Sequence, residues 1–180
     1  LSRLQPEPIH FMPLLQGEPW HYRRRMRLSV LFDSKNHKLN IGLRRKNSQQ
    51  IIPIEHCLVL EQPLNDLLPK LTALFEQWTT PQQLGHIELV AADNGIAMLL
   101  RHIKNIGETD RTLLLRFAEQ HQLMLFVQEH DSIEHWQGEQ PFYRLDDDLT
   151  LQFDIRDFIQ INAQLNRQMI ATALDWLELN

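Results

Sequence analysis

The stretch Asp154-Ile155-Arg156-Asp157-Phe158-Ile159-Gln160-Ile161-Asn162 joins a region rich in predicted strands to one predicted amphipathic helix. If residues 158–162 are extended, Phe158, Gln160 and Asn162 point to one side. The Gln160 carboxamide offers a donor and an acceptor, which suits recognition of a planar polar ligand, and Asn162 is a favoured helix N-cap. A buried strand end followed by a good N-cap explains the same residues, and the pattern alone favours this plainer interpretation.

Length and composition limit the class of protein. With 180 residues, the chain forms one domain of ordinary size, or one domain and a piece of another. Its single cysteine, Cys57, excludes an internal disulfide framework and fits a reducing compartment. No apolar run reaches membrane-spanning length, so we expect a cytoplasmic protein without membrane attachment. The proline-dotted beginning at Leu1 leads us to expect an excised fragment.

Hydrophobic periodicity predicts more strands than helices. Pro69 implies a kink or break in the first helix, and Asp93-Asn94-Gly95 is a strong hairpin signal. Because hairpin links dominate, the predicted fold class is α+β, with a mostly antiparallel mixed sheet and two or three helices before the final one. The predicted strands are 22–32, 38–45, 51–54, 84–91, 96–103, 124–128, 132–137 and 149–153, and the predicted helices are 63–78, 109–121 and 163–177. Residues 138–148 are expected to be turns, and the last helix is expected to bury Leu165, Met169, Ala173, Trp176 and Leu177.

Positive charge is concentrated near the beginning of the chain. Residues 20–46 hold nine basic residues and one acid, so this segment carries +8 and the rest of the chain, whose total is −5, carries −13. Alternation over 22–32 places Arg23, Arg25 and Arg27 in a row on one strand face, since side chains on one face recur about every 7 Å.

The row of arginines and the strand that follows it predict a basic hairpin. No acids are interleaved with the arginines, so we expect uncompensated guanidinium groups suited to phosphate contacts, although a solvated face is the alternative. Lys38, Arg44 and Arg45 on the returning strand would extend the patch, with Leu39, Ile41 and Leu43 facing inward.

Several kinds of site are not supported by the residue spacing. The six glycines lie far apart, so neither a dinucleotide fingerprint nor a phosphate-binding loop is present. The nine histidines lack the spacing of a zinc site, which argues against a self-contained metalloenzyme. Residues 146–148 are three aspartates that lack the spaced carboxylates of a calcium loop, and we interpret them as a solvated turn.

Four segments resemble, in this order, the RNA uracil-C5 methyltransferase family, and most of all its members that act on 23S ribosomal RNA. They are residues 22–28 (YRRRMRL), Cys57 ahead of the first predicted helix, residues 84–89 (LGHIEL) and residues 156–162 (RDFIQIN). The resemblance spans residues 22 to about 177, and its last segment is the most specific.

The resemblance implies a division of the chain into a leading segment 1–20, a central RNA-facing α+β domain 21–155 and the start of a Rossmann-like methyltransferase domain 156–180. It implies S-adenosylmethionine as cofactor, with Gln160 lining the pocket for cofactor and target base. It also implies an iron-sulfur (4Fe-4S) cluster in the intact enzyme, with Cys57 as one of four cysteine ligands and the other three before Leu1. RNA contacts are expected from Arg23, Arg25, Arg27, Phe158 and Asn162.

The implied reaction is methyl transfer to C5 of a flipped uracil, after attack of a cysteine thiolate at C6 and before removal of the C5 proton by a general base. Neither nucleophile nor base is assigned in this chain; both are expected beyond Asn180. The 180 residues alone are therefore expected to be inactive and to bind S-adenosylmethionine weakly or not at all. We expect a monomer whose partner is 23S ribosomal RNA. The alternative is a non-catalytic α+β interaction domain whose basic hairpin binds an acidic partner.

Overall fold

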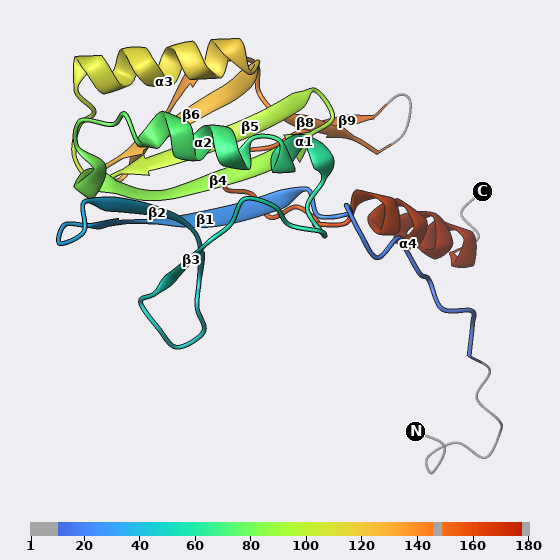
Figure 1. Ribbon diagram of the computed structural model, residues 1–180. Helices are drawn as coiled ribbons and strands as arrows, with labels where there is room; N and C mark the ends of the chain where they lie inside the picture. The colour runs from blue at the N-terminus through green and yellow to red at the C-terminus, as the bar shows by residue number, and fades with distance from the viewer. Residues whose placement is uncertain (1–10, 146–148, 178–180) are drawn as a thin grey trace.

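The computed structural model describes residues 11–145 and 149–177, and a seven-stranded sheet is its central element (Figure 1). The strand order is β3-β2-β1-β4-β5-β6-β7, and β8 and β9 form a separate two-stranded sheet. The strands are β1 (Arg25–Asp33), β2 (Lys38–Arg44), β3 (Ile51–Pro53), β4 (Leu84–Ala92), β5 (Gly95–His102), β6 (Leu123–Glu129), β7 (Ser132–Gln137), β8 (Phe142–Arg144) and β9 (Thr150–Gln152).

All neighbours in the large sheet are antiparallel except β5 and β6, which are parallel. Helix α3 (Glu108–Gln120) makes the crossover that this parallel pair requires. The predicted hairpin is present: Ala92 pairs with Gly95, whose φ of +134° is readily adopted only by glycine. The predicted α+β fold with a mostly antiparallel mixed sheet is confirmed.

Helices cover one face of the sheet. Helix α1 (Gln62–Asn65), helix α2 (Leu68–Phe75) and α3 pack there, and a short 3-10 turn η1 (Pro81–Gln83) precedes β4. The predicted helix 63–78 is broken into α1 and α2; Pro69 lies in the first turn of α2, where its missing N–H is tolerated. The largest fully buried side chains of this core include Leu28, Leu64, Leu71, Phe75, Ile87, Leu89, Met98, Leu100 and Leu114.

The second face of the sheet is covered only in part. Phe153, Ile155 and Ile159 pack against apolar side chains of β4, β5 and β6, with Tyr143 of β8 beside them. Strand β8 lies within the segment predicted to be turns, because three residues are too few for alternation to be recognised. This layer attaches the segment that follows β9 to the sheet.

Two predictions of burial are wrong. Leu43 was expected to face inward but is 42% exposed, because it lies toward the end of β2 beside Ile52 of β3, which is 52% exposed. None of the residues of the final helix, α4 (Ala163–Trp176), is buried, and Met169, Trp176 and Leu177 are exposed. Figure 1 shows the reason: α4 lies beyond the end of the sheet and away from the helical layer.

Candidate cofactor and nucleic-acid site

The residues before β1 are a junction of three chain segments. The Arg23 backbone bonds to residues on the way to α1: its N–H donates to Val59 O (2.8 Å), and its carbonyl accepts from Glu61 N (3.0 Å). The N–H of Arg24 donates to Ile161 O (3.0 Å), and the Arg24 carbonyl accepts from Ala91 N of β4 (2.8 Å). The beginning of the basic strand is therefore joined directly to the segment that contains Gln160.

Arg24 is buried, with 4% of its surface exposed. Its Nε donates to the backbone carbonyl of Gln160 (2.8 Å), and its guanidinium carbon lies 5.4 Å from the centre of the Tyr143 ring. Burial lowers the pKa of Arg24, while the carboxylates of Asp93 and Glu61 oppose that shift. The sequence pattern marked Arg24 only by its position on the apolar face of the predicted strand; its role was not recognised.

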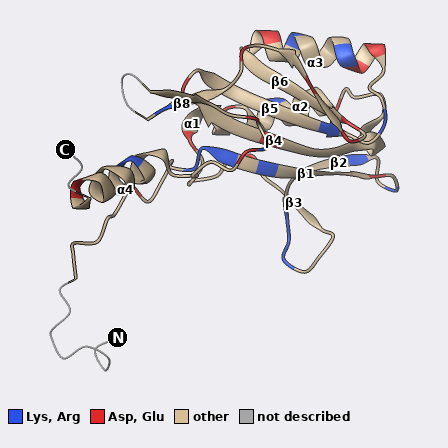
Figure 2. Ribbon diagram, turned by 180° about the vertical axis from the view of Figure 1, so that it is seen from behind, with Lys and Arg blue, Asp and Glu red and all other residues tan. Residues whose placement is uncertain are grey.

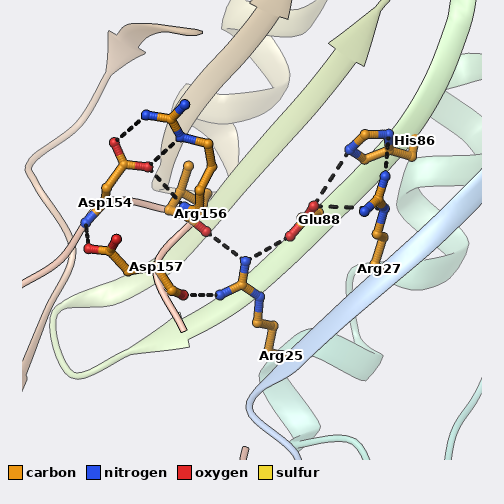
Figure 3. A network of polar contacts seen from close by, with 8 residues as sticks. Arg25, Arg27, His86, Glu88, Asp154, Arg156 and Asp157 are labelled. Carbon is orange, nitrogen blue, oxygen red and sulfur yellow. Dashed lines mark hydrogen bonds and ion pairs between the residues drawn. The ribbon is translucent and has the colours of Figure 1, made fainter. Parts of the chain in front are cut away.

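Arg25, the first residue of β1, binds the same segment with its own side chain (Figure 3). Its Nη1 donates to the carbonyl of Asp157, and its Nη2 donates to the carbonyl of Ile155 (2.8 Å). Nη2 also lies 2.9 Å from Oε2 of Glu88 on β4. The prediction of uncompensated arginines is therefore wrong for Arg25, because the acid that pairs with it comes from a neighbouring strand rather than from its own.

Glu88 is the centre of a polar cluster with Arg25, His86 and Arg27 (Figure 3). His86 Nε2 lies 3.5 Å from Glu88 Oε1, and Arg27 Nη2 lies 3.2 Å from His86 Nδ1. The arrangement is consistent when Nδ1 accepts from Arg27 and Nε2 carries the hydrogen toward Glu88. The contact with His86, followed by the two arginines, lowers the pKa of Glu88 to about 2 against the opposing effect of burial.

Arg27 differs from the other arginines of the row because its side chain is 62% exposed. Its Nε is 3.8 Å from Glu88 Oε1, a longer separation than that of Arg25. By contrast, Arg23 uses its Nε to bond to the carbonyl of Arg25 (2.9 Å). Arg27 is thus the member of the row with the most surface available to a partner.

The returning strand β2 and the residue after it also carry exposed basic side chains. Figure 2 shows basic positions on both β1 and β2. Lys38 is exposed and lies opposite Asp33 in the register of β1 and β2. Arg44 and Arg45 are exposed and donate to the side chains of Gln49 and Gln50, respectively.

The segment after β9 is irregular rather than a strand, but its side chains at 158–160 alternate between exposed and buried positions. Ile159 is buried, whereas Phe158 is 83% exposed and Gln160 is exposed. Asn162 caps α4: its Oδ1 accepts from the N–H of Leu165 (2.9 Å). The N-cap prediction is confirmed. The predicted strand end is wrong: an isolated bridge joins Asn162 to Arg23, and arginine side chains bond to the carbonyls of Ile155, Asp157 and Gln160.

A hollow of about 320 Å³ lies where this segment meets α4. Gln160 lines it together with apolar and amide side chains, a combination typical of small-molecule sites. The other lining residues are Tyr22, Ile161, Asn162, Leu165, Asn166 and Met169. Tyr22 was not predicted to belong to a site, and its only signal was its place at the start of the resembling segment 22–28.

Cys57 is half-buried in the loop before α1 and packs against the edge of the main core. The buried Asn65 side chain accepts from Cys57 N (2.8 Å) and donates to Cys57 O (3.0 Å). Within the described ranges, no group of three or more His, Cys, Asp or Glu side chains could hold a metal ion. The three aspartates at 146–148 lie outside the described residues.

Comparison with known proteins confirms the resemblance to RNA uracil-C5 methyltransferases. The chain is 60% identical over 179 residues to a protein of Histophilus somni named 23S rRNA (uracil(1939)-C(5))-methyltransferase RlmD, covering 99% of the chain and 41% of that relative. Proteins of the same name from Pasteurella multocida and Haemophilus influenzae (strain 86-028NP) are 59% and 58% identical over 99% and 100% of the chain. The chain spans about two fifths of the length of these relatives. No family model matches it.

A solved structure supports the fold. The tRNA (uracil-54, C5)-methyltransferase of Pyrococcus abyssi, in complex with S-adenosyl-L-homocysteine, matches 88% of this chain and 42% of its own with a TM-score of 0.66. At 16% sequence identity this likeness concerns the fold alone. In the part of the chain that the structure describes, no helix has the length and apolar character needed to span a membrane.

We expect the Glu88 cluster to make stability depend on pH. A carboxylate whose pKa falls from 4.5 to about 2 on folding stabilises the fold above the unfolded pKa, and this contribution is lost as the pH falls toward the folded value. Glu88→Gln should therefore lower the free energy of unfolding at neutral pH by about 2–3 kcal/mol. Urea denaturation should show that the difference in the free energy of unfolding between wild type and Glu88→Gln shrinks as the pH falls from 4.5 to 2.

The exposed Glu139 supplies the control for this experiment. Glu139→Gln makes the same change of charge away from the cluster and should leave stability nearly unchanged. A Glu88→Gln deficit that stays constant across the acid range would contradict the role assigned to the charged carboxylate.

Proposed function

We propose, from the membership of this chain in the RNA uracil-C5 methyltransferase family, that the full-length protein methylates C5 of a uracil in 23S ribosomal RNA. The observation that carries the proposal is identity of 58–60% over nearly the whole chain to proteins named for that reaction. S-adenosylmethionine, when bound, supplies the methyl group. Because the proposed substrate is ribosomal RNA, we also propose that the protein acts in the cytoplasm. We propose in addition that it is a monomer.

We propose that residues 21–155 form the RNA-facing domain and that residues 156–180 begin the catalytic domain. The main support is α4: none of its described side chains is buried, although its sequence is amphipathic. Its attachments to the sheet domain are few, including an ion pair between Arg167 and Asp93 (3.6 Å). An apolar helix face of this kind is typical of an element that packs against further protein.

We propose that Gln160 contacts the cofactor and the target base. Its carboxamide makes no hydrogen bond among the described residues, and it lines the hollow beside α4. A free carboxamide offers a donor and an acceptor to a planar polar group. Phe158, with its exposed ring, is suited to stacking on a base, and Asn162 at the end of α4 lies beside the same hollow.

We propose that Arg27 is the principal phosphate contact of the basic strand, with Lys38, Arg44 and Arg45 extending the surface. Arg27 is supported by its exposure, whereas Arg23 and Arg25 already hold backbone carbonyls of this chain. Direct RNA contacts by Arg23 and Arg25 stay predictions. Arg25 has a further contact of its own: its guanidinium joins the basic strand to the Ile155 and Asp157 carbonyls, in the segment that leads to Gln160.

We propose that Cys57 supplies one ligand of an iron-sulfur cluster in the full-length protein. This chain offers a single thiol, so it provides at most one of four cysteine ligands. Support comes from the loop: the Asn65 side chain bonds to both backbone polar groups of Cys57, so the backbone that carries the thiol is held in place.

Gln160→Ala in the full-length enzyme should reduce methyl transfer at saturating RNA by at least about tenfold, because an interaction with the reacting groups is removed. RNA affinity should change by less than about twofold, since no phosphate contact is lost. Single-turnover assays and filter binding measure the two quantities. A Gln160→Ala enzyme that lost RNA affinity but kept the wild-type rate of methyl transfer at saturating RNA would contradict this assignment.

Arg27→Gln should weaken RNA binding and reduce the slope of log affinity against log salt by about one unit, as expected for one lost phosphate contact. Arg116→Gln on α3 is the matched control, because this exposed arginine lies on the helical side of the sheet. Binding titrations at several salt concentrations measure both. If Arg116→Gln had the larger effect, the RNA-facing surface would lie on the helices instead.

Cys57→Ser in the full-length protein should lower the iron content and the visible absorbance of the cluster, since a hydroxyl is a poorer ligand than a thiolate. Metal analysis and absorption spectroscopy of the purified protein measure the change. Iron content equal to that of the wild type would show that Cys57 is only a packing residue.

A further inference from the structure

Arg24 connects the RNA-facing strand to the segment proposed to contact the cofactor. We infer that Arg24 is a positioning residue, whose buried guanidinium fixes the backbone of Gln160 and thereby directs the Gln160 carboxamide into the hollow beside α4. This inference rests on the proposed function, because it deepens the role given there to Gln160. Arg24 itself is not expected to touch the cofactor, the base or the RNA.

Two successive carbonyls of the segment are held by this one residue. Nε of Arg24 bonds to Gln160 O (2.8 Å), and the backbone N–H of Arg24 bonds to Ile161 O (3.0 Å). Fixing both peptide groups on the C-terminal side of Gln160 restricts the backbone angles there. Since the carboxamide makes no hydrogen bond of its own within the described residues, the fixed backbone sets the direction of the Cα–Cβ bond and so the side of the segment on which the carboxamide lies.

The surroundings of Arg24 make this arrangement specific. A buried charge is costly unless it is paired and hydrogen-bonded. The guanidinium lies over the Tyr143 ring, and the carboxylates of Asp93 and Glu61 act on it favourably. The Asp93 carboxylate lies 3.6 Å from Arg167 of α4, so the helix that lines the hollow is attached next to the same carboxylate.

Lysine could not reproduce this contact. The bond to Gln160 uses Nε of a planar guanidinium, whereas a lysine ammonium is a point charge at the end of a flexible stem. Arg24→Lys therefore keeps the charge but loses the fixed geometry, and Arg24→Met removes both while keeping much of the apolar volume.

The experiment uses the full-length enzyme and a double-mutant cycle. Arg24→Met should raise the dissociation constant for S-adenosylmethionine about tenfold and leave RNA affinity within about twofold. Adding Arg24→Met to Gln160→Ala should produce no further loss, because Arg24 acts through Gln160. The control is Arg111→Met, which removes an arginine that also lies over an aromatic ring, that of Trp136 (4.4 Å), far from the hollow.

Fully additive losses of S-adenosylmethionine affinity from Arg24→Met and Gln160→Ala would overturn the inference. It would also be overturned if Arg111→Met weakened S-adenosylmethionine binding as much as Arg24→Met does. If Arg24→Met does not fold, hydrogen exchange of Arg24→Lys supplies the test: peptides covering 158–165 should exchange faster than in wild type, with peptides covering 111–120 unchanged. Unchanged exchange at 158–165 would overturn it. A wild-type enzyme that fails to methylate 23S RNA would refute the proposed function instead, and the exchange measurement would still report on Arg24.

Discussion

The structure depends on the burial of one arginine, Arg24. A guanidinium with 4% of its surface exposed must find hydrogen bonds and carboxylates nearby, because leaving it unpaired costs several kcal/mol. Those partners come from four places far apart in the chain: the Gln160 carbonyl, the Tyr143 ring, and the acids Asp93 and Glu61. Satisfying this one charge brings together the strand, the second layer and the segment that leads into α4.

Arg25, the next residue along the chain, follows the same principle. It satisfies two backbone carbonyls that no ladder reaches and at the same time pairs with Glu88. The segment after β9 therefore keeps a defined path without being a strand. Arg24 and Arg25 thus bond to backbone carbonyls of this segment, whereas the side chain of Arg27 is exposed. Within one basic stretch, two arginines stabilise the fold and a third leaves its charge exposed to solvent.

Helix α4 differs from the rest of the described structure in how much of it is buried. The sheet domain has a continuous core between strands and helices, whereas the described part of α4 has no buried side chain. Hydrophobic burial is the main stabilising contribution for an amphipathic helix. An amphipathic helix held chiefly by its N-cap and an ion pair is therefore consistent with a chain that spans about two fifths of its relatives' length.

Periodicity predicted most of the strands and helices, because alternation and helical spacing are local properties. Single residue types predicted the hairpin at Asp93–Gly95, the break near Pro69 and the cap at Asn162. Short sequence motifs likewise pointed to the family through residues 156–162. Only the tertiary structure decided which arginine is buried, which acid pairs with Arg25, and whether the final helix is covered. Those outcomes depend on residues more than 60 positions apart in sequence, such as Arg25 and Glu88. Neither residue type nor local spacing can specify such pairings, since they arise only when the strands are assembled side by side.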